Sequence, residues 1–131
     1  MNTNLSKLQV LIVDDERNIL NIYCTMLDME GHKCICAPSA EDAIRILEDT
    51  PIDILVTDHR MPGISGEELL GYVKEKSPDT RRIMISGDAG IAQHSAELVE
   101  QGLAHKFVKK PCDVNTFLKA IKEQVNQVPI G

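Results

Sequence analysis

Three carboxylates, one hydroxyl and one ammonium group stand directly after apolar runs of the chain, where they could share a site. Asp14 and Asp15 follow the first run, and Asp58, Ser86 and Lys110 each end a later one. Carboxylates in one crevice repel each other and raise each other's pKa unless a cation neutralises them. Because no Cys or His stands at these positions, the ligand set favours a hard cation, Mg²⁺ or Mn²⁺.

A site of this kind indicates phosphoryl chemistry. Mg²⁺ usually takes only one or two protein carboxylates and completes its shell with waters and phosphate oxygens. A lysine ammonium and a serine hydroxyl are the expected partners of the remaining phosphoryl oxygens. An Asp carboxylate can itself be the nucleophile that forms an aspartyl-phosphate. The residue types therefore predict a site where a carboxylate meets a phosphoryl group and a divalent cation.

Five strand-and-helix units would bring these residues together, and the sequence indicates them. Apolar, β-rich runs alternate with segments of helical spacing. Strands are expected at 8–13, 33–37, 52–57, 82–86 and 104–109, and helices at 17–29, 40–48, 67–76, 91–101 and 114–125. This alternation predicts an α/β fold, a doubly wound parallel sheet with helices on both faces. In such a sheet the ligand crevice lies outside the carboxyl ends of the strands, where the polar residues stand.

The composition fits one globular domain and argues against several functions. The chain has 131 residues, of which 43% are hydrophobic and 26% charged, as in ordinary globular domains. A net charge of −6 and an aromatic content of 3% argue against nucleic-acid binding. No apolar run approaches the ~20 residues of a membrane span, and the N-terminus has no secretory signal. We therefore expect a cytoplasmic protein without direct nucleic-acid or membrane contacts.

The cysteines and histidines show no spacing typical of a metal site. Cys24, Cys34, Cys36 and Cys112 contain no CxxC pair, so a zinc site has no support from ligand spacing. Cys34 and Cys36 stand two apart in a predicted strand and point to the same face, so they cannot easily pair with each other. We expect buried free thiols in a reducing cytoplasm. The histidines are scattered along the chain, at His32, His59, His94 and His105.

Four short motifs carry a resemblance to a known family. They are VDDE at 13–16, TDHRMPGISG at 57–66, ISG at 85–87 and KKP at 109–111. In this order, each at the end of a predicted strand, they resemble the receiver domain of bacterial two-component response regulators, over about residues 8–126. The resemblance implies a CheY-like sheet of five parallel strands in the order 2-1-3-4-5, flanked by five helices. It also implies a single receiver domain over 1–131, with 127–131 as a tail or the start of a linker.

The resemblance assigns the acidic residues to phosphorylation. Asp58 would be the phosphoacceptor. Asp15, Asp58 and the backbone carbonyl of Arg60 would bind Mg²⁺ or Mn²⁺, and Asp14 would hold a metal-bound water. Arg60 and Asp88 would flank the site at positions that tune the loss of phosphate in the family. Their opposite charges predict a long-lived aspartyl-phosphate.

The other motif residues would bind the phosphoryl group and transmit its presence. Ser86 and Lys110 would contact the phosphoryl oxygens, and Gly87 would leave access to the acceptor. The peptide bond between Lys110 and Pro111 would be cis. Phe107 would be the aromatic switch residue of the last strand, although it cannot make the hydrogen bond of the Tyr that many relatives carry. Phosphorylation would repack the face formed by the fourth helix, the last strand and the last helix.

The resemblance implies signalling partners rather than an enzyme. A sensor histidine kinase or a phosphotransfer protein would supply the phosphoryl group, and the domain would assist its own phosphorylation and dephosphorylation. The signal would pass to a downstream effector protein or to a fused output domain that is not in this chain. A dimer linked to phosphorylation is also compatible with the family.

Three other functions compete with this one. A haloacid-dehalogenase-type phosphatase would need a cap domain, and a second Asp two residues after its nucleophile, where this chain has Glu16. A flavodoxin-like cofactor binder would need a phosphate-binding loop after the first strand and aromatic residues around the cofactor. A phosphorylation-independent receiver-like interaction module commonly lacks one of the five site residues, whereas this chain has all five.

Overall fold

The computed structural model describes residues 8–87, 91–110 and 113–126. Asp88, Pro111, Cys112 and the tail 127–131 lie outside these ranges, so what the sequence predicts for them stays a prediction. Among the described helices, none combines the length and the apolar character that crossing a membrane requires.

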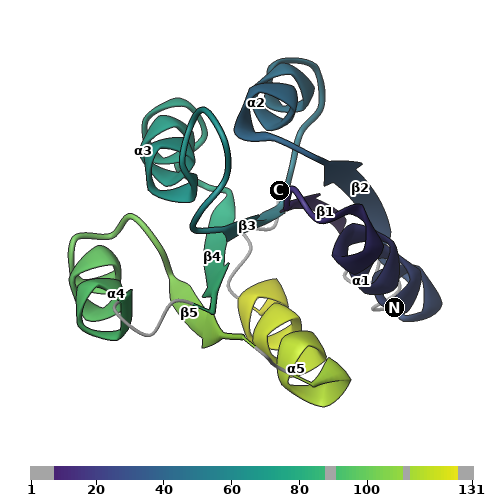
Figure 1. The fold of residues 1–131 in the computed structure, drawn as a ribbon. Coiled ribbons are helices and arrows are strands. Elements are labelled where there is room, and N and C mark those ends of the chain that lie inside the picture. The colour runs from purple at the N-terminus through teal and green to yellow at the C-terminus, as the bar shows by residue number, and fades with distance from the viewer. Residues whose placement is uncertain (1–7, 88–90, 111–112, 127–131) are drawn as a thin grey trace.

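A five-stranded parallel sheet organises the chain (Figure 1). Its strand order, β2-β1-β3-β4-β5, confirms the predicted doubly wound topology. The strands are β1 (Gln9–Val13), β2 (Lys33–Ala37), β3 (Ile54–Asp58), β4 (Arg81–Ser86) and β5 (Lys106–Lys109). The helices are α1 (Arg17–Met29), α2 (Ala40–Asp49), α3 (Gly66–Lys76), α4 (Ile91–Glu100) and α5 (Val114–Val125).

Helices cover both faces of the sheet, as the sequence predicts (Figure 1). On one face, α2, α3 and α4 pack on the sheet in a core that contains Leu11 and Leu69. On the other face, α1 and α5 form a second core with Ile12 and Phe117. Leu11 and Ile12 are neighbours in β1 and point to opposite faces, because strand side chains alternate. The middle parts of β1, β3 and β4 are therefore buried and apolar, and they hold the residues at the strand ends in fixed positions.

Helix starts agree with the sequence prediction to within one residue, whereas β3 and β5 each begin two residues later than predicted. The side chains of Ser39 and Asp113 each accept a hydrogen bond from the backbone N–H three residues on, at 3.1 Å and 2.7 Å. Such caps stabilise the first turn of a helix. β5 begins two residues later than predicted, because the N–H groups of Leu103 and Ala104 donate to the carbonyl of Leu98 at the end of α4.

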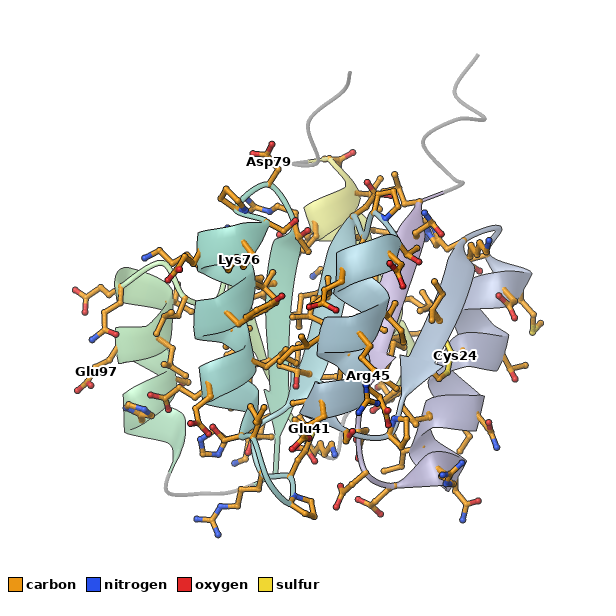
Figure 2. All side chains as sticks on the ribbon, turned by 90° about the horizontal axis from the view of Figure 1, so that it is seen from above. Cys24, Glu41, Arg45, Lys76, Asp79 and Glu97 are labelled. Atoms are coloured by element: carbon orange, nitrogen blue, oxygen red, sulfur yellow. A yellow bond between two sulfur atoms is a disulfide. The ribbon has the colours of Figure 1, made fainter. Side chains whose placement is uncertain are left out.

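The amino ends of the strands form one edge of the sheet, which we call the amino edge and define by Asp53, Thr80, Arg82 and His105. Arg82 is 3% exposed. Its guanidinium group donates to four backbone carbonyls, those of Pro78 (3.2 Å), Thr80 (3.0 Å), Gly102 (3.0 Å) and Leu103 (2.9 Å). One buried side chain thereby ties the end of α4 to the loop before β4. Figure 2 shows Asp79 of that loop at one end of the molecule and Glu41 toward the other.

The cysteines differ from the predicted buried free thiols. The sulfur of Cys24 in α1 lies against the sulfurs of Cys34 and Cys36 in β2, and all three side chains are half-buried. The reason is that α1 packs along β2, which brings the Cα of Cys24 to 5.3 Å from that of Cys34 and 7.1 Å from that of Cys36. Sequence spacing cannot show this approach, because a turn between the two elements creates it.

Candidate functional site

The carboxyl ends of the strands form the opposite edge of the sheet, the carboxyl edge, defined by Asp14, Asp15, Asp58, Ser86 and Lys110. β1 and β3 are neighbours in register, so the residues that follow them come together. Carboxylate oxygens of Asp14, Asp15 and Asp58 all lie within 4.8 Å of one another. The structure therefore forms the acidic pocket that the sequence places at the strand ends.

Backbone hydrogen bonds orient two of the three carboxylates. Oδ1 of Asp14 accepts a bond from the N–H of Glu16 at 3.0 Å, and Oδ1 of Asp58 accepts one from the N–H of His59 at 2.8 Å. Asp14 is 3% exposed, whereas Asp15 lies at the surface. Each anchored carboxylate thereby keeps its second oxygen, Oδ2, for the pocket.

Lys110 provides the ammonium group of the pocket. Its Nζ lies 3.0 Å from Oδ2 of Asp14 and 3.4 Å from Oδ2 of Asp58. The N–H of Lys110 donates to the carbonyl of Ser86 at 2.8 Å, which joins the ends of β4 and β5. Ser86 is itself buried, at 2% exposure. The hydroxyl and the ammonium predicted to act together thus lie at adjacent strand ends.

The charges of the pocket are not balanced. Burial raises the pKa of Asp58; the attraction of Lys110 opposes this rise, and repulsion from Asp14 adds to it. Burial disfavours the charged form of Lys110, but its contacts with Asp14 and Asp58 together outweigh that cost and raise its pKa. Three carboxylates therefore face one ammonium group. A hard divalent cation fits this set of oxygen atoms and would relieve the repulsion.

Gly66 lets the loop after β3 close against the backbone of Asp58. Its N–H donates to the carbonyl of His59 at 2.9 Å. A Cβ atom at Gly66 would collide with the backbone carbonyl oxygen of Asp58. The sequence indicates Gly66 only as a loop residue, because a requirement for close backbone approach is not visible in spacing.

The comparisons with known proteins decide the family. The model of the response regulator receiver domain matches residues 10–122. The chain belongs to this family. Accepting a phosphoryl group is the general function of receiver domains, which are generally non-enzymatic signalling domains, and no observation favours the competing functions.

Relatives of this receiver domain are longer proteins. The hydrogenase transcriptional regulatory protein HoxA of Cupriavidus necator is 31% identical over 116 residues, which cover 88% of this chain and 24% of HoxA. The response regulator protein FleR of Pseudomonas aeruginosa is 27% identical over 122 residues, which cover 92% of this chain and 25% of FleR. The chain thus spans about a quarter of the length of these curated relatives.

Solved receiver domains have the same fold. A CheY-like response regulator receiver domain from Methanospirillum hungatei is 26% identical with a TM-score of 0.86, over 92% of this chain and 95% of that one. The response regulator protein TrrA from Thermotoga maritima, solved in complex with Mg²⁺-BeF, is 27% identical with a TM-score of 0.78. That match covers 88% of this chain and 97% of TrrA.

The remaining predicted residues that the structure describes differ in exposure. Arg60 is exposed in the loop after β3. Gly87 is exposed beside Lys110, and a Cβ atom there would meet the Cβ of Lys110 at 3.4 Å, an ordinary contact. Phe107 is half-buried in β5, where it packs against the core on the α4 side.

Two histidines lie closer together than the sequence indicates. Nε2 of His94 in α4 lies 2.8 Å from Oε1 of Glu67 in α3, and Nε2 of His59 lies 3.8 Å from the same oxygen. The histidines of the receiver domain are therefore not all scattered, because Glu67 at the start of α3 lies near both His59 after β3 and His94 in α4. Contact with Glu67 raises the pKa of His94.

Proposed function

We propose that Asp58 is the phosphoacceptor of this receiver domain. Its side chain is 13% exposed and lies between Lys110 and two further carboxylates, and this arrangement is the observation that carries the proposal. A carboxylate oxygen of Asp58 attacks the phosphorus of a phosphohistidine, and the phosphorus–nitrogen bond breaks. Its electron pair stays on the imidazole nitrogen, and solvent supplies the proton that the free histidine needs.

The acidic residues are the proposed holders of Mg²⁺, with Mn²⁺ as the alternative. Asp15, Asp58 and the backbone carbonyl of Arg60 would bind the cation directly, and Asp14 would bind through a water. Three carboxylate oxygens within 4.8 Å of one another support this assignment. Bound there, the cation supplies positive charge against the phosphoryl oxygens. The Mg²⁺-BeF complex of the similar protein TrrA lends further support.

Ser86 and Lys110 are the proposed partners of the phosphoryl oxygens. The ammonium group of Lys110 already touches Asp58 at 3.4 Å, so a phosphoryl group on that carboxylate would come within its reach. The hydroxyl of Ser86 would donate to another phosphoryl oxygen. Movement of Ser86 would let Phe107 repack, which carries the change to the face formed by α4, β5 and α5.

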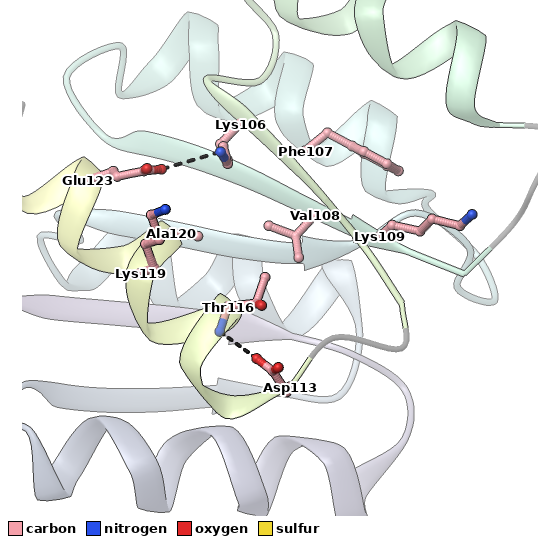
Figure 3. A pocket seen from close by; sticks show the side chains of 9 residues that line it. All are labelled: Lys106, Phe107, Val108, Lys109, Asp113, Thr116, Lys119, Ala120 and Glu123. Carbon is pink, nitrogen blue, oxygen red and sulfur yellow. Dashed lines mark hydrogen bonds and ion pairs between the residues drawn. The ribbon is translucent and has the colours of Figure 1, made fainter.

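A groove between β5 and α5 is the proposed contact surface for a partner (Figure 3). It has a volume of about 480 Å³, and Val108, Thr116 and Ala120 lie between its charged residues; Phe107 also lines it, but the ring of Phe107 packs on the opposite, α4 side of the sheet. Its charged lining residues are Lys106, Lys109, Asp113, Lys119 and Glu123. Mixed charge favours a polar, transient contact. The proposed partners are a sensor histidine kinase or phosphotransfer protein, and an effector, a fused output domain or a second copy of the chain.

Arg60 is the proposed regulator of phosphate loss. It is exposed beside the acceptor loop, where its charge could hinder an attacking water together with Asp88. We expect an Arg60→Ala variant to lose phosphate faster than the unaltered protein, measured by the decay of the phosphorylated mass. An unchanged decay rate would remove this role. We further propose that residues 1–131 form a single receiver domain with its core over about 8–126; the cytoplasmic location stays a prediction.

The experiment is intact-mass analysis after incubation with acetyl phosphate. We expect one phosphoryl adduct in the presence of Mg²⁺, and none with EDTA or in the Asp58→Asn variant. The matched control is Asp53→Asn, which makes the same chemical change at the amino edge and should leave the adduct intact. An adduct that persists in Asp58→Asn would overturn the assignment. No adduct under any condition would favour the phosphorylation-independent module.

A further inference from the structure

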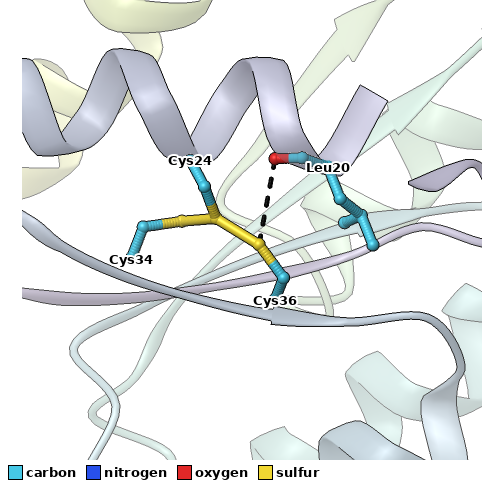
Figure 4. The surroundings of a disulfide bond; sticks show 4 residues. All are labelled: Leu20, Cys24, Cys34 and Cys36. Atoms are coloured by element: carbon cyan, nitrogen blue, oxygen red, sulfur yellow. Dashed lines mark hydrogen bonds between the residues drawn. A yellow bond between two sulfur atoms is a disulfide. The ribbon is translucent and has the colours of Figure 1, made fainter. Parts of the chain in front are cut away.

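Three cysteines converge between α1 and β2, outside the set of residues that forms the acidic pocket. Cys34 and Cys36 lie on β2, the strand at one end of the sheet, and Cys24 lies on α1, which packs along it. Figure 4 shows the sulfur of Cys24 between those of Cys34 and Cys36. All three side chains are half-buried, so solvent species can approach them. The function derived above uses none of these thiols.

A disulfide does not account for all three sulfurs. One sulfur can form a single bond to another, so Cys24 can pair with Cys34 or with Cys36 but not with both. The Cα separation of 5.3 Å to Cys34 suits a disulfide, whereas 7.1 Å to Cys36 exceeds the usual range. Either pairing would leave a third thiol packed against the bond.

A single metal ion does account for all three. The three sulfurs lie within 4.8 Å of one another. In a tetrahedral site with a Zn–S length of ~2.3 Å, two sulfurs lie about 3.8 Å apart. The sulfurs of Cys34 and Cys36, which are in contact with that of Cys24, would therefore move away from it to admit the ion. Thiolates select soft or borderline ions such as Zn²⁺ and Cu⁺ over Mg²⁺. The chain would thus separate two kinds of cation, with oxygen ligands at the carboxyl edge and sulfur ligands between α1 and β2.

We propose that Cys24, Cys34 and Cys36 bind one thiophilic metal ion through three thiolates. Three S–H bonds break, three protons pass to solvent and three S–metal bonds form, so no oxidant is needed. The proton of Cys36, whose sulfur lies 3.8 Å from the carbonyl oxygen of Leu20, is one of the three. A solvent or exogenous ligand completes the coordination shell, as in zinc sites with three protein ligands. The bound ion would cross-link α1 to β2.

The test uses Zn²⁺ and reduced protein under anaerobic conditions. We expect one equivalent of Zn²⁺ to bind in competition with a colorimetric chelator. Cys24→Ser, Cys34→Ser and Cys36→Ser should each weaken binding by more than about tenfold, because even losing a second-shell contact typically costs ~10–100-fold in metal affinity. Cys112→Ser is the matched control and should bind like the unaltered protein. Asp15→Asn should also bind normally, which separates this site from the acidic pocket.

A second measurement needs no variant. Zn²⁺ should protect three of the four cysteines of the unaltered protein from alkylation, counted by intact mass. Equal binding by all cysteine variants, or loss of binding in Asp15→Asn alone, would overturn the proposal. The proposal would also be overturned if the reduced protein takes up no Zn²⁺ and peptide mapping after air oxidation finds a Cys24–Cys34 disulfide. The cluster would then be a redox pair.

Discussion

The two edges of the sheet differ in whether their charged groups have enough partners. At the carboxyl edge, Asp14, Asp15 and Asp58 face one ammonium group, and burial keeps the pKa of Asp58 raised. At the amino edge, the guanidinium group of Arg82 donates to four backbone carbonyls. The carboxyl edge has an excess of negative charge that a bound cation would neutralise, whereas the buried charge at the amino edge is already hydrogen-bonded within the protein.

This difference separates stability from function within one fold. Buried polar groups stabilise a protein when they are hydrogen-bonded and destabilise it when they are not. The amino edge therefore contributes to folding, and the carboxyl edge lowers stability until a cation binds. Removing a carboxylate from the carboxyl edge should then raise the free energy of unfolding, whereas removing a hydrogen-bonded charge from the amino edge should lower it.

The largest effect is expected from Arg82→Met. This variant keeps much of the aliphatic stem but leaves the four carbonyls without their donor, so the free energy of unfolding should fall by about 3 kcal/mol. Urea unfolding monitored by circular dichroism measures it. Arg81→Met is the control, because the guanidinium Nε of Arg81 donates at 2.9 Å to the side chain of Gln124, a contact outside the four carbonyls. Equal losses in the two variants would contradict the role given to Arg82.

The carboxyl edge can be disrupted without changing any charge. Gly66→Ala places a Cβ atom against the backbone carbonyl of Asp58, and the loop must shift to admit it. We expect a loss of about 1–3 kcal/mol and a lower rate of phosphorylation by acetyl phosphate. Gly71→Ala in the same helix is the matched control, since a Cβ atom there meets nothing within 4 Å. It should raise stability by up to about 1 kcal/mol; a loss in Gly71→Ala as large as that in Gly66→Ala would refute the steric explanation.

A pair of Asp→Asn variants tests the comparison most directly. Asp58→Asn removes a carboxylate from the unbalanced pocket and should raise the free energy of unfolding in EDTA by up to about 1 kcal/mol. Asp53→Asn weakens the bond from the N–H of Gln9 to Oδ2 of Asp53, 2.9 Å long, and should lower it by a similar amount. Thermal unfolding of both proteins in EDTA gives the sign. Destabilisation by Asp58→Asn would mean that its contact with Lys110 outweighs the repulsion.

The acidic pocket could be predicted from the sequence because its signal is local. Each residue of the pocket follows an apolar strand directly, and parallel strands bring their carboxyl ends together whatever the loops do. The convergence of Asp14, Asp58 and Lys110 could therefore be predicted without any knowledge of side-chain contacts. The sheet order was predicted from the family resemblance of the motifs, and the structure confirms it.

Other features could not be predicted, because they depend on packing between elements. The contact of Cys24 with Cys34 and Cys36 arises from the path of α1 along β2. The requirement at Gly66 arises from the carbonyl of Asp58, eight positions before it. From the sequence alone, Arg82 looks like any charged residue of a strand, because its carbonyl partners come from other parts of the chain. Spacing along the chain carries no information on such approaches.

The pH dependence of stability follows from His105 at the amino edge. Burial and the neighbouring Arg81 and Arg82 lower the pKa of His105 to about 4, so the folded protein keeps this ring neutral. Neutral Nδ1 accepts a bond from the N–H of Arg82 at 2.9 Å. The contribution of His105 to stability is complete above its unfolded pKa of about 6.5 and is lost as pH falls toward 4. Replacing His105 with Gln should therefore flatten the decline of the urea midpoint across this window.

Asp58 supplies the opposing slope in the same titration. The pKa of Asp58 is raised in the folded protein, so protonation relieves repulsion in the folded pocket. The contribution of Asp58 to the free energy of unfolding therefore rises as pH falls through that pKa. Asp58→Asn should therefore steepen the acid-side decline that the substitution of His105 flattens. Urea midpoints of the two variants, measured between pH 7 and about 4 at fixed ionic strength, separate the edges. Slopes that change in the same direction would show that the two edges do not differ in how they hold charge.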